Sequence, residues 1–407
     1  MAGSDKRRVD LAFILRSLGN PVFTKQMDER QQQDPVASRQ QLNVGSAIGN
    51  QPKEKPVRRT IAILAGTALA ASTVALAAPA SAKETIPAGG ASFPAVFMQQ
   101  CAADFNGSQN NFTVTYTSTG SGTGKGNFSK GTFVFGMTDS KYSSGEPTFE
   151  WEYVPLIGGS IALPINLKNP KTGRTLGSSI QLKQTTLAKI WGGVITTWNH
   201  PEILKDNPRI AKTLPATNIT LSYRSDTSGT TNNFLQYLNA WAPSIFSKVQ
   251  DDMGTAFPGG KPPANSVAGR TNQGVMANVL STEGAIGYVD LGDAKGYPSA
   301  RLQNAAGEFV APSAASAAKN LANQTNLDSK GLVQLNYKLN VKGVYPISIF
   351  SYGLARTDGK GPNGLGVRQF FDYTLAKCGP SRAASLGFVP LAGKVLAKGR
   401  QLVQEIK

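Results

Sequence analysis

The stretch that reads Arg-Ser-Asp-Thr-Ser-Gly-Thr-Thr from position 224 combines residue types that suit the binding of an anion. Arg224 supplies a forked cationic donor, and Asp226 is placed to pair with the guanidinium and hold it. Ser228 and Thr230 supply hydroxyl donors, and Gly229 lets the backbone approach a ligand closely. Taken alone, the same residues also fit a capped helix with a surface ion pair, so the stretch leaves both interpretations open.

A strand and a helix are expected on either side of this stretch. Residues 218–223 alternate between apolar and polar side chains, as on a half-buried strand. Residues 232–238 place apolar side chains at helical spacing. A strand therefore runs through a short hydroxyl-rich turn into the start of a helix. Because a helix start carries unpaired backbone N–H groups and a partial positive charge, this geometry favours a bound anion.

Two further segments repeat this arrangement. Residues 89–94 read Gly-Gly-Ala-Ser-Phe-Pro and open a helical pattern with apolar residues on one face. Another apolar run, residues 132–137, ends just before Asp139. Several strand-to-turn junctions that carry serine, threonine and glycine, together with one arginine and one aspartate, predict a receptor for an oxyanion.

A glycine-rich loop follows the strand predicted at residues 113–117 and ends at Lys125. It is similar to a phosphate-cradling P-loop, but Thr119 stands where the first glycine of that motif belongs. Gly126 then follows the lysine in place of serine or threonine. We therefore reject a nucleotide-binding loop.

At these residues the chain resembles a known family, the PstS-type high-affinity phosphate-binding proteins of bacterial phosphate ABC transporters, which include DING-like proteins. The resemblance runs from about Glu84 into the C-terminal region. Residues 187–199 are similar to the substrate-domain helix of that family. Two departures, His200 and the pair Met137-Thr138, stand outside the ligand contacts that the family implies. The matching motifs, in chain order, lie at 89–94, 120–122, 135–139, 155–159, 224–230 and 284–289.

The resemblance implies a phosphate site made of short polar residues, one arginine and one aspartate. Phe93 would contribute through its backbone N–H, and Asp226 would support Arg224. No cofactor and no metal are implied. The implied contacts are Ser92, Phe93, Ser121, Asp139, Arg224, Ser228, Gly229 and Thr230.

Asp139 is the residue that predicts selectivity. An ionised carboxylate repels an anion unless the anion has a proton to donate, and phosphate keeps a proton at neutral pH while sulfate has none. Sulfate would leave the carboxylate unpaired in a dry cleft, at a cost of about 1–3 kcal/mol. Taken without its neighbours, Asp139 also fits an aspartate that caps a turn.

Strands alternate with helices along the chain, which predicts an α/β fold. The resemblance implies the type II periplasmic-binding-protein class, with two lobes and the ligand cleft between them. About 325 residues after the leader also exceed a comfortable single core. The first lobe would comprise 83–165 and 345–407, and the second 166–344. We expect the segment 311–329 to form a helix and loop on the surface of the second lobe.

The two cysteines, Cys101 and Cys378, each fall on an apolar helix face. An even count in an exported protein suggests a disulfide. The implied fold places both in the first lobe, which makes pairing feasible, and two buried free thiols remain the alternative.

A secretory signal peptide is expected at residues 57–82. Two arginines precede an apolar run that ends in Ala-Ser-Ala, so cleavage is expected after Ala82. No cysteine lies near that point, so a lipoprotein anchor is not expected. The protein would be secreted, in an extracellular or periplasmic location. Residues 1–56 would be a disordered leader or the result of a mis-assigned start.

The chain carries a net charge of +17, and residues 1–82 hold 11 basic and 6 acidic side chains, which leaves +12 beyond them. The basic residues are scattered, so nucleic acid is not an expected partner. The only histidine, His200, gives no local support to a catalytic scheme, so no enzyme activity is expected.

The sequence thus predicts a monomeric receptor that binds inorganic phosphate and passes it to the membrane permease of an ABC transporter. A receptor for another tetrahedral oxyanion is the first alternative. A secreted phosphate-related enzyme, or an adhesive protein that reuses the fold, is the second.

Overall fold

The computed structural model describes residues 82–407, which belong to one compact unit. The leader predicted at 1–56 and the signal peptide predicted at 57–82 lie outside the described residues, apart from Ala82. Both stay predictions.

Fourteen strands are found in the described part of the chain. They are β1 (Glu84–Gly90), β2 (Phe112–Ser118), β3 (Phe135–Thr138), β4 (Trp151–Ala162), β5 (Ile165–Asn166), β6 (Gln181–Leu182), β7 (Thr220–Arg224), β8 (Ser266–Gly269), β9 (Ala285–Gly287), β10 (Val289–Asp290), β11 (Arg301–Gln303), β12 (Phe309–Val310), β13 (Ser348–Arg356) and β14 (Phe388–Val389).

Helices alternate with these strands, and within residues 82–407 none is long and apolar enough to cross a membrane. A π-helical turn, η4 (Thr374–Cys378), follows the helix α11. The α-helices are α3 (Ala95–Ser108), α4 (Ser121–Ser129), α5 (Gln184–Trp191), α6 (Pro201–Asp206), α7 (Gly229–Trp241), α8 (Met253–Ala256), α9 (Thr271–Ser281), α10 (Ala314–Leu321), α11 (Gly364–Tyr373), α12 (Gly379–Arg382) and α13 (Gly393–Glu405).

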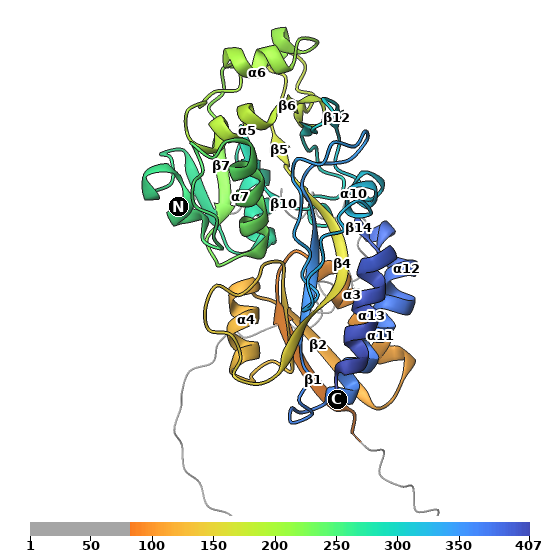
Figure 1. Cartoon of the computed structure of the whole chain (residues 1–407). Helices are drawn as coiled ribbons and strands as arrows, with labels where there is room; N and C mark the ends of the chain where they lie inside the picture. The colour runs from red at the N-terminus through yellow and green to blue at the C-terminus, as the bar shows by residue number, and fades with distance from the viewer. Residues whose placement is uncertain (1–81) are drawn as a thin grey trace, which may run out of the picture. The chain divides into compact units, whose positions relative to one another are not determined.

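A seven-stranded sheet organises the part of the molecule that we call the first lobe. Its strand order is β10-β4-β13-β3-β1-β2, and β14 also pairs with β4. β1 runs parallel to β2 and β3, while β13 is antiparallel to β3 and β4. Nearly every residue of β4 and β13 is buried, as expected for strands covered on both faces. Figure 1 shows α4 on one side of this sheet and α11 and α13 on the other.

A four-stranded sheet of order β5-β9-β7-β8 organises the second lobe. β7 is parallel to both β8 and β9, so the helices α7 and α9 return the chain from one parallel strand towards the next. A separate three-stranded sheet has the order β12-β11-β6. The α/β class predicted from the alternation of strands and helices matches this architecture.

The chain passes directly between the two large sheets at two places. It leaves β4 at Ala162 and enters β5 at Ile165, and it returns through Tyr288, the single residue between β9 and β10, which the sequence did not suggest. After β10 it runs through β11 and β12 of the small sheet before it enters β13 at Ser348. The lobe bounds drawn from the sequence, at 165/166 and 344/345, stay a prediction.

Helix α10 lies differently from what the sequence suggested. We expected residues 311–329 on the surface of the second lobe, but α10 packs against β4, β13 and β14 of the first lobe's sheet. Gly158 of β4 makes room for it, because a β-carbon there would lie 2.3 Å from Leu321 Cδ1. The absence of a side chain at Gly158 therefore allows α10 to pack against β4.

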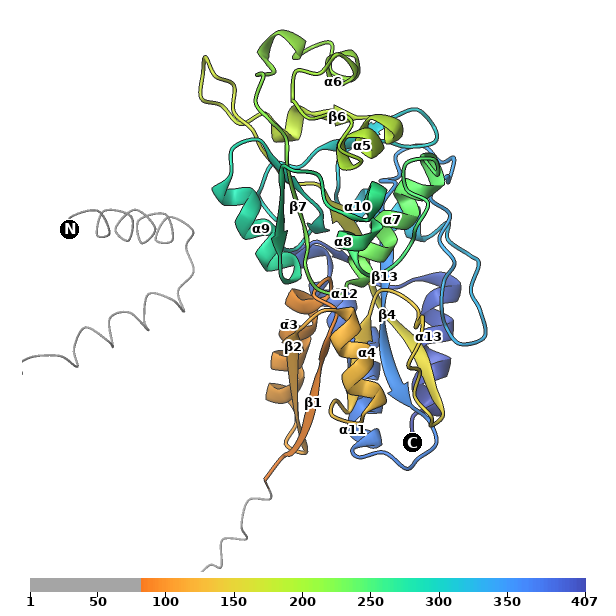
Figure 2. The same cartoon turned by 90° about the vertical axis from the view of Figure 1, so that its left-hand side faces the viewer.

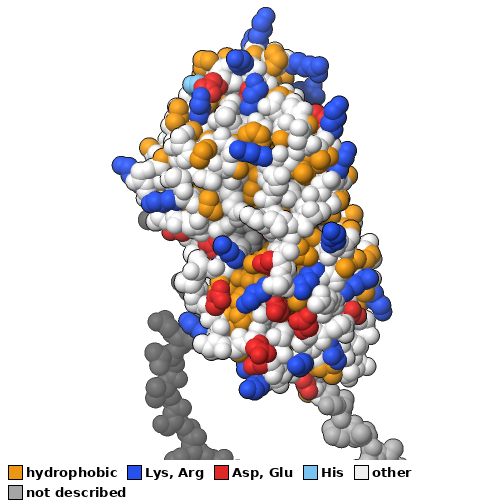
Figure 3. Space-filling model, viewed as in Figure 1, with side chains coloured by type: hydrophobic (Ala, Val, Ile, Leu, Met, Phe, Trp, Pro, Cys, Tyr) orange, Lys and Arg blue, Asp and Glu red, His pale blue; other side chains and the backbone are white. Residues whose placement is uncertain are grey.

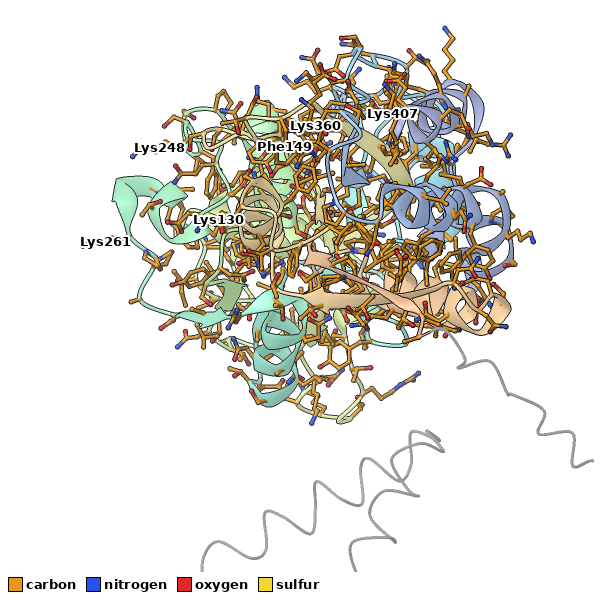
Figure 4. All side chains as sticks on the ribbon, turned by 90° about the horizontal axis from the view of Figure 1, so that it is seen from below. Lys130, Phe149, Lys248, Lys261, Lys360 and Lys407 are labelled. Atoms are coloured by element: carbon orange, nitrogen blue, oxygen red, sulfur yellow. A yellow bond between two sulfur atoms is a disulfide. The ribbon has the colours of Figure 1, made fainter. Side chains whose placement is uncertain are left out.

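The basic side chains are spread over the surface. On the face shown in Figure 3, lysines and arginines are scattered over both lobes rather than gathered in one patch. The lysines labelled in Figure 4, among them Lys130, Lys261 and Lys360, are exposed and come from several parts of the chain. This distribution gives no support to a nucleic-acid surface among the described residues.

A disulfide joins Cys101 of α3 to Cys378 at the end of η4, with 5.7 Å between the two Cα atoms. Both residues are buried. The bond closes a separation of 277 residues and ties the first helix of the lobe to its C-terminal helices. The described residues contain no free cysteine.

Replacing Cys101 and Cys378 together by serine is expected to lower the free energy of unfolding by about 2–5 kcal/mol, because the open chain gains conformational entropy when unfolded. Urea denaturation of the wild type and the variant measures the difference. Reductant should destabilise the wild type and leave the variant unchanged. Equal stability of the two proteins would contradict a structural role for the bond.

Candidate functional site

The residues expected to bind an anion follow the carboxyl ends of parallel strands. Ser92 lies two residues after β1, Ser121 three residues after β2, and Asp139 directly after β3. Arg224 ends β7 of the second lobe. In open α/β sheets ligands bind at such strand ends. Figure 2 shows α4 of the first lobe directly below α7 and α8 of the second, so these strand ends face one another.

Helix starts lie at the same place. Ser121 is the first residue of α4, and Gly229 is the first residue of α7. A β-carbon on Gly229 would lie 2.8 Å from both Ser121 Oγ and Asp139 Cβ, so only glycine allows the two lobes to approach this closely. The unpaired N–H groups of two helix starts thus meet beside one aspartate, which suits an anion.

Three serine hydroxyls of the site already accept hydrogen bonds from backbone N–H groups. Ser92 Oγ accepts from Asn272 N at 3.2 Å, and Ser228 Oγ accepts from Thr231 N at 3.2 Å. Ser121 Oγ accepts from Asp139 N at 3.4 Å. Since a hydroxyl that accepts still has its own proton, each serine can donate to an anion.

Arg224 is 1% exposed, and three of its five N–H groups are engaged. Nε and Nη2 donate to the two carboxylate oxygens of Asp226, and Nη1 donates to Asn272 Oδ1 at 2.7 Å. One N–H on each Nη has no partner among residues 82–407, so both nitrogens can still donate to an oxyanion.

Asp139 is the acidic group of the site and is 4% exposed. Its Oδ1 accepts from Ser351 Oγ at 2.7 Å, and its Oδ2 accepts from Thr230 Oγ1 at 3.3 Å. Burial raises the pKa of Asp139 to about 6, and the nearby Asp251 adds to this. The Ser351 hydrogen bond, the charge of Arg224 and the Thr230 hydroxyl act in the opposite direction.

Phe93 and Asp226 occupy supporting positions. The ring of Phe93 is fully buried and meets Phe388 edge to face with 5.8 Å between ring centroids, so its side chain belongs to the core. Only its backbone, next to Ser92, is left to face a ligand. Asp226 pairs with Arg224 and also accepts from Thr271 N at 2.9 Å.

Several contacts between the two lobes lie beside these residues. Gly122 N donates to Thr227 O at 3.1 Å. Lys125, the lysine of the glycine-rich loop, pairs with Asp251 of the second lobe at 2.7 Å. Its amine therefore serves a contact between lobes, in agreement with our rejection of a P-loop. A β-carbon on Gly120 would collide with Asp226, so this glycine is also required by the approach of the lobes.

Sequence reasoning missed three residues of the site. Ser351 lies in β13 and reaches Asp139 from 212 positions away. Asn272 begins α9 and contacts both Arg224 and Ser92. Asn233 donates from Nδ2 to the backbone carbonyl of Asp139 at 2.7 Å. Asn272 could have been recognised from the polar sequence Thr-Asn-Gln-Gly that follows a strand. Ser351 could not, because a serine inside a buried strand has no local sequence pattern that points to a site.

Metal binding finds no support in the described part of the chain, where no group of three or more histidine, cysteine, aspartate and glutamate side chains could hold an ion. His200 accepts from Glu202 N and caps α6. Figure 1 shows α6 at the end of the second lobe that lies away from the first.

Comparisons with known proteins agree with the geometry. A family model described as a PBP superfamily domain matches residues 75–377. The phosphate-binding protein PstS of Xylella fastidiosa (strain 9a5c) is 34% identical over 324 residues, which cover 77% of this chain and 84% of that protein. The chain belongs to the PstS family. The resemblance deduced from the sequence motifs is thereby confirmed.

Other relatives and solved structures extend this result. PstS of Haemophilus influenzae is 31% identical and covers 78% of this chain and 92% of its own length. The solved structure of the periplasmic phosphate-binding protein PfluDING, bound with phosphate, superposes with a TM-score of 0.63 at 24% identity and covers 78% of this chain and 93% of that chain. At this identity the likeness shows the fold alone, and it confirms the predicted α/β periplasmic-binding-protein fold.

Asp139→Asn is expected to stabilise the protein more at pH 7.5 than at pH 5. The folded-state pKa of about 6 lies above the ordinary value of 3.8, so folding favours the protonated form and stability falls as pH rises through this range. The gain from the substitution should be about 1–2 kcal/mol larger at pH 7.5. Urea denaturation in phosphate-free buffer measures it.

Asp358→Asn is the control for this experiment. Its partner Arg356 lowers the pKa of Asp358 to about 2, so the effect of the substitution should not change between pH 5 and pH 7.5. An effect of Asp139→Asn that is equally independent of pH would show that the carboxyl has no raised pKa.

Ser351→Ala is expected to move the titration of Asp139 to higher pH, because the lost hydrogen bond favours the ionised carboxylate. Carbon NMR of the Asp139 carboxyl follows the midpoint. Ser348→Ala, a buried serine of the same strand that donates to Tyr345 O, is the matched control and should leave the midpoint in place. An unchanged midpoint in Ser351→Ala would refute this role.

Proposed function

We propose that the protein binds inorganic phosphate, as hydrogen phosphate, between its two lobes and delivers it to an ABC-type phosphate permease. The buried Asp139 carboxylate, set among groups that can donate, is the observation that carries this proposal. The proposed contacts are the hydroxyls of Ser92, Ser121, Ser228 and Thr230, the backbone N–H groups of Phe93 and Gly229, the guanidinium of Arg224 and the carboxylate of Asp139, with Asp226 in support.

Arg224 and the helix starts supply donors that any tetrahedral oxyanion could use. Asp139 has the opposite need, because its carboxylate can only accept a hydrogen bond, and the ligand must donate it. Hydrogen phosphate satisfies both. Sulfate would satisfy the donors and leave the carboxylate facing a negative oxygen, at a cost of about 1–3 kcal/mol, or roughly tenfold to a few hundredfold in affinity.

The names of the relatives support the same ligand. The Xylella fastidiosa and Haemophilus influenzae relatives are named as phosphate-binding proteins. A solved structure from Clostridium perfringens, described as a putative phosphate ABC transporter substrate-binding protein with bound phosphate, shares the fold at a TM-score of 0.52. We extend the phosphate and the permease partner to this chain on the strength of its own site.

A ligand that contacts both lobes favours the closed arrangement by as much as it binds that arrangement better than the open one. Here the first lobe would provide Ser92, Ser121 and Asp139, and the second Arg224 and the start of α7. We propose lobe bounds of 83–165 with 345–407, and 166–344, with β10 and α10 as the parts of 166–344 that pack on the first lobe's sheet. Secretion after cleavage at Ala82 and a monomeric state belong to the same proposal.

A receptor without enzyme activity fits the placement of the titratable groups. The only histidine of the chain, His200, caps α6, and Asp226 is held in an ion pair with Arg224. Both carboxylate oxygens of Asp139 accept hydrogen bonds, from Ser351 and Thr230. No general base is therefore proposed for the site, and hydrolysis of phosphate esters is not expected.

Titration of the ligand-stripped protein by calorimetry tests the proposal. At pH 8 we expect saturable one-to-one binding of phosphate and no heat from sulfate. At pH 5 the protonated Asp139 can donate, so discrimination against sulfate should weaken. Equal binding of both anions at pH 8 would leave a general oxyanion receptor. Silence to both, or metal-independent turnover of a chromogenic phosphomonoester, would refute the receptor.

A further inference from the structure

Asn272 makes three polar contacts at the first turn of α9, and it is fully buried. Its Oδ1 accepts from Arg224 Nη1 at 2.7 Å. Its Nδ2 donates to Asp290 Oδ2 at 2.9 Å, and its backbone N donates to Ser92 Oγ at 3.2 Å. The side chain thus contacts the arginine of the site, while the backbone contacts a serine of the other lobe.

The guanidinium of Arg224 decides which way the amide of Asn272 points. Arg224 Nη1 can only donate, so the carbonyl oxygen of Asn272 must face it, and the NH2 end faces Asp290 Oδ2. Asp290 is itself held, because its Oδ1 accepts from Asp293 N at 2.9 Å. Gln273 in turn donates to both carboxylate oxygens of Asp293.

Arg224 is consequently held from two directions. Asp226 takes Nε and one N–H of Nη2, and Asn272 takes one N–H of Nη1. Rotation of the guanidinium would break contacts on both sides. One N–H on each Nη remains to donate to an oxyanion.

Arg224 ends β7, and its partners Asp226 and Asn272 lie in segments that follow strands of the four-stranded sheet, whereas Asp290 lies in β10, which pairs with β4 of the seven-stranded sheet. The contacts that Asp226 and Asn272 make with Arg224 therefore lie within the second lobe, so the ligand does not have to order the arginine on binding. The Asn272–Ser92 hydrogen bond joins the two lobes and forms only when they meet. It makes Ser92 Oγ an acceptor, so the serine proton is left to donate to the ligand.

We propose that Asn272, held by Asp290, is a positioning residue that aims the guanidinium of Arg224 at the anion. The proposal rests on the proposed function for the identity of the anion. Its structural part, the restraint on Arg224, stands independently and is tested separately.

The first test uses nitrogen NMR of the Arg224 guanidinium in the ligand-free full chain, with the signals assigned by their loss in Arg224→Lys. The wild type should show slow rotation about the Cζ–Nη bonds. Asn272→Ala should show fast rotation about the Cζ–Nη1 bond, while Nη2 stays held by Asp226. Asn278→Ala is the matched control, because Asn278 lies on the same helix and donates to Ala268 O. Fast rotation in the wild type would overturn the proposal whether or not phosphate binds.

The second test is a double-mutant cycle with inorganic phosphate. Asn272→Ala should raise the Kd roughly tenfold to a hundredfold. In the Arg224→Lys background the same substitution should change the Kd less than about threefold, since an ammonium offers no fork to orient. Equal losses in both backgrounds would show a merely structural role and overturn the proposal.

Asn272→Ser serves as a second variant if the alanine variant does not fold, since its short hydroxyl cannot reach both Arg224 and Asp290. Thermal denaturation establishes that each variant is folded before titration. If the wild type binds no phosphate, the proposed function fails, and the NMR comparison alone decides the role of Asn272.

Discussion

The opposed buried charges of Arg224 and Asp139 are the constraint on which the rest of the described structure depends. A buried ion is costly unless it has partners, and each of these two has its own: Asp226 and Asn272 for the guanidinium, Ser351 and Thr230 for the carboxylate. The arginine charge lowers the pKa of Asp139 while burial raises it to about 6. A tetrahedral anion with one proton satisfies both groups at once, because it accepts from the arginine and donates to the aspartate.

Both local features and long-range contacts of the fold hold Arg224 and Asp139 in place. Strand ends of two sheets bring the polar residues together, and helix starts add backbone N–H groups at the same point. Glycine at Gly229 lets the lobes meet. The ladder between β4 and β13 shifts register between Ser351, opposite Ile157, and Tyr352, opposite Pro155, which has no N–H to donate. The Cys101–Cys378 disulfide fixes the first helix of the lobe to its last ones.

The sequence predicted the parts of the site that are local. A strand, a short polar turn and a helix start can be recognised within a dozen residues, and this located Ser92, Ser121, Asp139 and the turn from Arg224 to Thr230. Contacts that join distant segments could not be predicted, because neither Ser351 in a buried strand nor the packing of α10 on Gly158 leaves a local pattern. The pairing of the two cysteines also stayed open until the structure placed their Cα atoms 5.7 Å apart.

The central claim is that Asp139 accepts a hydrogen bond from the bound anion, and the most direct measurement compares the affinities for phosphate and sulfate in the wild type and in Asp139→Asn at pH 8. The amide can donate to sulfate, so the ratio of the two affinities should fall roughly tenfold to a few hundredfold. Asp251→Asn, a neighbouring aspartate that pairs with Lys125, should leave the ratio unchanged. An unchanged ratio in Asp139→Asn would contradict the account.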